Sequence, residues 1–209
     1  MPALASRIDE FDKLMCDRGL FVRGASELEM RSQSINKEER SFEAVAATET
    51  PAMMRDYRTW DIIDEILVAK GGQFPSQIPL LDSHMRFELA DQLGSARAFT
   101  RKNEQWVGRG FVGRAVAGNA KREQVWQDIE DGHIRSVSIG YQVLNYVDIP
   151  AGKRSKIDGK TYQAGDRVLR ISTEWRAHEL SVVSIGADSL ALIRSRLGNH
   201  APQKRSYFL

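Results

Sequence analysis

The chain has almost no cysteine. Cys16 is the single cysteine among 209 residues, so no disulfide can form within the chain. Metal sites built on several cysteines are excluded for the same reason, and the four histidines lack the close spacing of zinc ligands. We therefore expect a protein that uses no metal and no other cofactor, and one that fits a reducing compartment.

Long apolar runs and an excess of one charge are also missing. No apolar run approaches the ~20 residues that span a bilayer, and charged residues interrupt the N-terminal region where a signal peptide would be apolar. Lys and Arg number 30 against 28 Asp and Glu, a net charge of +2 that does not indicate a dedicated nucleic-acid binder. We expect no membrane partner, no specific nucleic acid and a cytoplasmic location.

The composition is that of a globular protein, with 42% hydrophobic and 28% charged residues. Alternating or short apolar runs predict several strands. Residues 61–68 fit either a helix or a strand, two prolines make residues 75–81 an edge or entry segment, and 148–167 is a polar excursion with a tight turn at 158–160. The other strands are predicted over residues 41–48, 95–100, 105–112, 134–147, 168–173 and 179–185.

Three helices are predicted between and around these strands. Apolar residues at steps of three and four indicate a helix over residues 3–17, and a single apolar face indicates a second helix over residues 119–131. A short third helix is expected over residues 189–197. Asn119 can cap the second helix and Gly132 can end it. The fold expected from the pattern is mainly β with helices, an α+β arrangement in which a closed antiparallel β-barrel is surrounded by helices.

Three apolar, strand-like stretches each carry one chemically useful side chain, namely His84, Ser138 and Glu179. A histidine, a serine and a carboxylate are the parts of a serine nucleophile that is activated by a base. Each also has an ordinary interpretation: a surface histidine, a serine on the polar face of a strand, and a carboxylate paired with Arg176. His178 competes with Glu179 for the third role, and Gly140 leaves space beside Ser138.

The same three stretches together resemble a known family. They are residues 79–84 (Pro-Leu-Leu-Asp-Ser-His), 131–141 (Asp-Gly-His-Ile-Arg-Ser-Val-Ser-Ile-Gly-Tyr) and 179–184 (Glu-Leu-Ser-Val-Val-Ser). They look like the prohead, or capsid maturation, serine proteases of tailed bacteriophages, which are related in fold to the herpesvirus protease assemblin. The resemblance covers roughly residues 28–195 and implies a herpesvirus-protease-like barrel.

Within this resemblance His84 matches the family's base and Ser138 its nucleophile. Glu179 matches the position of the third member, which is a histidine in the herpesvirus branch, while His178 is one residue out of register. Residues 187–189 (Ala-Asp-Ser) depart from the herpesvirus pattern, where arginines help bind the oxyanion. The residues of the oxyanion hole are therefore unassigned, and backbone N–H groups are the natural substitutes.

The resemblance implies a serine endopeptidase that cleaves scaffold and capsid proteins, and itself, during procapsid maturation. The implied partners are the scaffold, major capsid and portal proteins, with self-association, inside the assembling procapsid in the host cytoplasm. Residues 1–30 would be an N-terminal helix or pro-segment, 31–197 the protease domain and 198–209 a basic tail. The alternatives are an inactive capsid-assembly or scaffold component of the same fold and, ranked lower, an esterase, for which the Gly-x-Ser-x-Gly sequence is missing.

Overall fold

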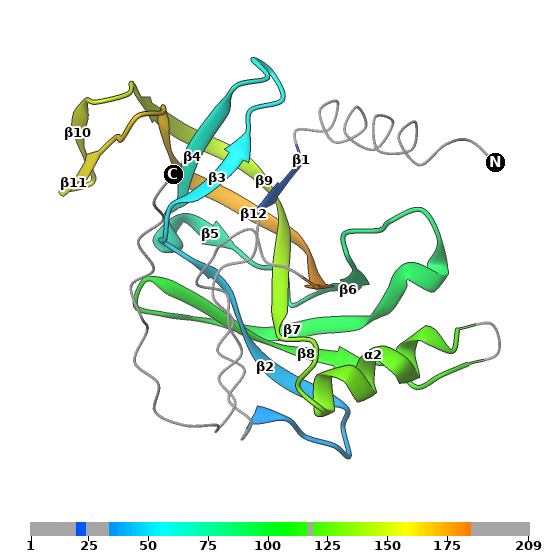
Figure 1. The fold of residues 1–209 in the computed structure, drawn as a ribbon. Coiled ribbons are helices and arrows are strands. Elements are labelled where there is room, and N and C mark those ends of the chain that lie inside the picture. Colours follow the sequence, from blue (N-terminus) through cyan, green and yellow to red (C-terminus); the bar gives the residue numbers. More distant parts are fainter. Residues whose placement is uncertain (1–19, 24–33, 117–118, 185–209) are drawn as a thin grey trace, which may run out of the picture.

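The computed structural model describes residues 20–23, 34–116 and 119–184, which are mostly strand (Figure 1). The strands are β1 (Leu20–Arg23), β2 (Ser41–Thr48), β3 (Ala52–Arg55), β4 (Ile62–Leu67), β5 (Gly72–Gln73), β6 (Gln77–Asp82), β7 (Gln92–Lys102), β8 (Gln105–Val112), β9 (Ser136–Ile149), β10 (Arg154–Ile157), β11 (Lys160–Gln163) and β12 (Leu169–Val183). The helical elements are α2 (Lys121–Glu130) and the short 3-10 turns η2 (Ala69–Gly71) and η3 (Leu89–Asp91).

One large sheet contains all of these strands except β10 and β11, which form a separate hairpin. The order along the sheet is β1-β9-β12-β6-β7-β8-β2. The long strand β12 is its axis: β9 runs antiparallel along one side, and β4, β5 and β6 run parallel to it in turn along the other. The middle of the chain and its last described strand are therefore joined through non-local pairs.

The predicted closed antiparallel barrel surrounded by helices is wrong. β1 and β2 lie at opposite ends of the strand order and do not pair with each other in the part of the chain that is described. The physical reason is the parallel pairing: three short strands share one side of β12, so the chain does not follow the hairpin-to-hairpin path of an antiparallel barrel. In the described part of the chain, α2 and the short 3-10 turns are the helical elements, where the sequence predicted a surrounding set of helices.

The main core contains side chains of the large sheet and of α2. Trp126 and Ile129 of α2 are buried in one cluster with side chains of β2, β6, β9 and β12. Gly132 ends the helix with a φ of +76°, as the sequence predicts. Asn119 does not cap it: Ala120 holds the N-cap position, and the Asn119 amide donates to the backbone oxygen of Ala90 instead. The ion pairs of Lys121 with Asp82 and of Glu123 with Arg40, together with this amide, fasten the N-terminal half of the helix to the rest of the fold.

Several local predictions hold. Strands form at β2, β7, β8 and β9, and the ambiguous segment 61–68 becomes strand β4. The Asp158-Gly159 turn is confirmed, with positive φ at both residues, and it joins β10 to β11, two strands that the sequence reading missed. Such φ values match the type I′ turn that favours Asp-Gly.

Two strand predictions need correction. The two strands predicted over residues 168–173 and 179–185 are parts of a single strand, β12 (Leu169–Val183), which pairs with β9 along its length with irregularities near Glu174 and Glu179. β6 is an interior strand, because it lies between β12 and β7 in the sheet order. Pro79 is tolerated there because β12 pairs with β6 only from Leu80 onward, so the missing N–H costs no hydrogen bond on that side. The predicted helices 3–17 and 189–197, the tail 198–209 and residues 187–189 lie outside the described residues.

Candidate active site

His84 lies in a tight turn directly after β6. Ser83 and His84 both have positive φ, 47° and 62°, a conformation that is uncommon outside glycine and clusters at functional sites. Two hydrogen bonds hold the turn against β12: the Ser83 N–H donates to the Val182 oxygen at 2.9 Å, and the His84 N–H donates to Ser181 Oγ at 3.0 Å. The backbone of His84 is thereby fixed beside the candidate third member.

Glu179 is the buried acceptor of this site, with 2% of the residue exposed. Its Oε1 lies 2.6 Å from His84 Nδ1 and accepts from the Arg86 guanidinium at 3.2 Å. Its Oε2 accepts from the Ser181 hydroxyl at 2.6 Å. Three donors thus offset the cost of burying this carboxylate, which would be large without partners.

The electrostatics favour an ionised Glu179. Burial alone would raise the pKa of this carboxyl, but hydrogen bonds from His84 and Ser181 and the charge of Arg86 together hold the pKa below its ordinary value. An ionised carboxylate can only accept, so it selects the His84 form that carries a proton on Nδ1. Nε2 is then the nitrogen left for a second partner.

Ser138 lies on β9, the strand beside Glu179. In the antiparallel register Ser138 is opposite Ser181 and Gly140 is opposite Glu179. Opposite residues of an antiparallel pair project from the same face. The space around Gly140 agrees, because a Cβ there would stand 2.1 Å from Glu179 Oε1. The structure therefore brings Ser138, Glu179 and the Ser181 hydroxyl that holds His84 to one face of the β9–β12 pair.

The other candidates from the sequence have different partners. Arg176, proposed as an ordinary salt-bridge partner of Glu179, donates to Gln73 Oε1 instead. His178 has a buried Nε2 for which the described residues offer no hydrogen-bond partner, and burial lowers its pKa. Glu179, and not His178, is therefore the residue that contacts His84.

A cavity of about 330 Å³ opens beside Glu179. The turn after β6 and the η3 region supply most of its lining, with His178 and Glu179 from β12. Phe87 and Leu89 on its rim are 49% and 90% exposed, which leaves apolar surface at the edge of the site. Among the described segments no cluster of three or more His, Cys, Asp or Glu side chains could hold a metal ion.

Sequence reasoning missed two residues of this site. Ser181 stands two positions after Glu179, and the period of two along a strand could have indicated that both side chains share a face. Arg86 stands two positions after His84 in an irregular turn, where no periodicity applies. Ser181 links the β6 turn to β12, and Arg86 adds the third donor to Glu179.

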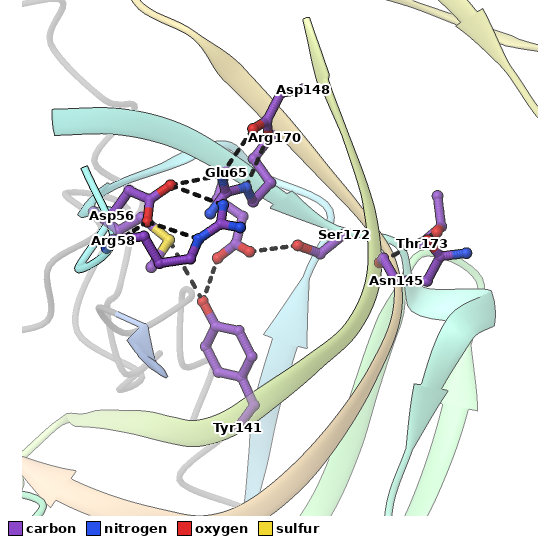
Figure 2. A network of polar contacts seen from close by, with 10 residues as sticks. Asp56, Arg58, Glu65, Tyr141, Asn145, Asp148, Arg170, Ser172 and Thr173 are labelled. Carbon is purple, nitrogen blue, oxygen red and sulfur yellow. Dashed lines mark hydrogen bonds and ion pairs between the residues drawn. The ribbon is translucent and has the colours of Figure 1, made fainter. Parts of the chain in front are cut away.

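A second buried carboxylate fixes β9 just beyond the site. Glu65 of β4, 1% exposed, accepts hydrogen bonds from the hydroxyls of Tyr141 and Ser172. Figure 2 shows the Glu65 carboxylate between these two side chains, which come from β9 and β12. Because Tyr141 follows Gly140 directly, this contact ties the strand of Ser138 to β4 and β12.

An ion-pair group lies next to it in Figure 2. The buried guanidinium of Arg170 contacts Asp56 at 2.7 Å and Asp148 at 2.8 Å. Burial would raise the pKa of Asp56, but hydrogen bonds from Arg58 and Arg170 outweigh it and lower the pKa to about 2. These charges join β12 to β9 and to the loop after β3, so they support the sheet at the end away from His84.

Comparison with known proteins finds one similarity that bears on function. The chain is 28% identical over 174 residues to the capsid polyprotein of Pseudomonas phage PAJU2. This similarity relates the chain to phage capsid proteins. It covers 83% of the chain but only 22% of the polyprotein, so the chain spans about a fifth of that relative. No family model and no solved structure matches the chain.

Helices long and apolar enough to cross a membrane are absent from the described part of the chain.

Proposed function

We propose that this chain is a serine endopeptidase that cleaves scaffold and capsid proteins, and itself, during maturation of a phage procapsid. The observation that carries the proposal is the 2.6 Å contact of His84 Nδ1 with the buried carboxylate of Glu179, on the same face as Ser138. A histidine oriented by a buried carboxylate is the arrangement that activates a serine.

The proposed chemistry follows from these positions. Ser138 Oγ attacks the carbonyl carbon of the scissile peptide bond, and Nε2 of His84 takes the hydroxyl proton. The imidazolium formed is stabilised by the ionised Glu179, and it then gives the proton to the leaving amine. Water, deprotonated by the same histidine, releases the acyl product and regenerates Ser138.

The capsid similarity supports the choice of substrate. The matching relative is a capsid polyprotein, and a polyprotein has to be cut to release its parts. The segment of the polyprotein that matches this chain, 22% of the polyprotein's length, would be the protease that makes those cuts. The proposed partners are accordingly the scaffold, major capsid and portal proteins, met inside the assembling procapsid in the host cytoplasm.

The test is mass spectrometry of the chain co-expressed with its capsid protein. We expect truncated capsid and protease products with the wild-type chain and none with Ser138→Ala, because the nucleophile is gone. Ser136→Ala is the matched control, since Ser136 lies two residues earlier on the same face of β9 and is also buried. Ser136→Ala should keep most of the processing.

The alternative, an inactive capsid-assembly component with the same fold, predicts a different result. In that case the wild-type chain and Ser138→Ala would yield identical, uncut proteins. Full processing by Ser138→Ala would instead mean that another residue is the nucleophile.

A further inference from the structure

β1 lies along the edge of β9 next to Ser138. Its four residues pair antiparallel with β9, from Leu20 opposite Gln142 to Arg23 opposite Ile139. β1 is the last strand in the sheet order, so β9 would be an open edge over these residues without it (Figure 1). An open strand edge next to a nucleophile is a template for an extended peptide.

The direction of the pairing matters for chemistry. β1 runs from Gln142 toward Ile139 of β9, so its carboxyl end points toward Ser138, the next residue of that strand. A peptide bound in this direction delivers the residues before a scissile bond to the β9 edge. The acyl part of a substrate would therefore lie along Ile139–Gln142, and its carbonyl would arrive at the nucleophile.

We propose that the β9 edge from Ile139 to Gln142 binds the acyl side of substrate peptides, and that β1 is the chain's own strand on that edge. This inference rests on the proposed protease function. Substrate peptides must be extended and must displace β1, because both use the same backbone groups of β9. Ser138 is 2% exposed with β1 in place, in line with a site that is closed in the intact chain.

Backbone pairing also predicts what the edge selects. Hydrogen bonds to main-chain groups are available to any sequence that is free to extend, so affinity comes from the backbone and selectivity from side-chain pockets. Linkers between folded parts of a polyprotein can meet this requirement, whereas residues inside a folded sheet or helix cannot. The inferred substrate class is therefore an unfolded inter-domain segment.

The experiment uses full-length chains with Phe21→Pro or Val22→Pro, made separately. Neighbouring residues on a strand point their N–H groups to opposite sides, so one of these two groups faces β9. Proline lacks the N–H, so the proline substitution at the residue whose N–H faces β9 removes one hydrogen bond of the β1–β9 ladder. The proline substitution at the other residue removes no such bond and is the matched control. Val22→Ala, which keeps the N–H, is a further control.

The readout is the rate at which a fluorophosphonate phosphonylates Ser138 with release of fluoride, followed by peptide mass spectrometry. If β1 covers the edge ~90% of the time, one proline variant should label about tenfold faster than wild type and the controls within about twofold. A synthetic peptide of residues 18–27 added to the faster variant should restore slow labelling. Amide exchange at Ile139–Gln142 should rise in the same variant.

The possible failures are distinct. If no chain is labelled at Ser138, the proposed function is wrong. If every chain is labelled at the same rate, the function stands and β1 does not close the site. Faster amide exchange at the β9 edge without faster labelling would likewise overturn the inference, because the edge would then be open without any gain in access to Ser138.

Discussion

Replacing Glu179 with glutamine removes one charge from the contact with His84 while keeping the shape of the side chain. The amide oxygen can take the place of Oε1, where both His84 and Arg86 donate, and the amide nitrogen can then face the Ser181 hydroxyl. Two donors at Oε1 favour this orientation over the flipped one. The proton on His84 Nδ1 is therefore retained, and the main loss is the negative charge.

The size of the effect follows from that charge. Two unit charges ~4 Å apart interact by ~4 kcal/mol at an effective dielectric constant of about 20. Removing this stabilisation of the imidazolium slows the reaction about 10³-fold. The loss is smaller than the ~10⁴-fold cost of an amide in a template triad, where the amide imposes the wrong tautomer. In this chain Arg86 donates to the same oxygen as His84, so it holds the amide in the orientation that keeps the proton on His84 Nδ1.

The assay is the rate of Ser138 labelling by a fluorophosphonate, with circular dichroism as the check that the fold is intact. His178→Ala is the control, because His178 is adjacent to Glu179 and lines the same cavity, whereas Glu179 makes the hydrogen bond to His84 Nδ1. It should change the rate less than about tenfold, since it removes no charge from the imidazolium. A folded Glu179→Gln chain that labels at the wild-type rate would refute the reasoning, and so would a larger loss in His178→Ala.

Two further predictions concern the strands around the site. Gly140→Ala should slow labelling about 10²-fold or more, because its Cβ would stand 2.1 Å from Glu179 Oε1 and displace the carboxylate; Gly165→Ala, with open space around it, should have no effect. The pKa of Asp56 falls from 3.8 to about 2 on folding, so its stabilisation is complete above about pH 4 and is lost toward pH 2. At pH 7 the free energy of unfolding in urea should be ~2 kcal/mol larger for the wild type than for Asp56→Asn. A difference between the two chains that does not become smaller from pH 5 to pH 2 would contradict this prediction.

Local patterns in the sequence were sufficient for much of the secondary structure. Alternating apolar residues indicated β2 and β9, a short apolar run indicated β8, and turn chemistry indicated Gly132 and the Asp158-Gly159 turn. These signals act over a few residues, because side-chain alternation and positive φ are local properties. The same reading split β12 in two, since the irregularities near Glu174 and Glu179 interrupt its alternation although its pairing with β9 continues.

The candidate site shows the same division. The residue types named the candidates, since His84 and Glu179 each carried a polar group that an apolar strand does not need. Their contact depended on the turn of positive φ after β6 and on Ser181, which holds that turn against β12. A sequence pattern does not contain such a contact, because the two residues are 95 positions apart.

The sequence by itself therefore determined strands, turns and the residues able to do chemistry. Only the tertiary structure decided that β4, β5 and β6 run parallel to β12, that β1 and β2 end the described sheet without pairing with each other, and that β1 occupies the edge beside Ser138. The physical reason is that a strand's period states which face is apolar but not which neighbour pairs with it. That choice is made by packing and hydrogen bonding between segments far apart in the chain.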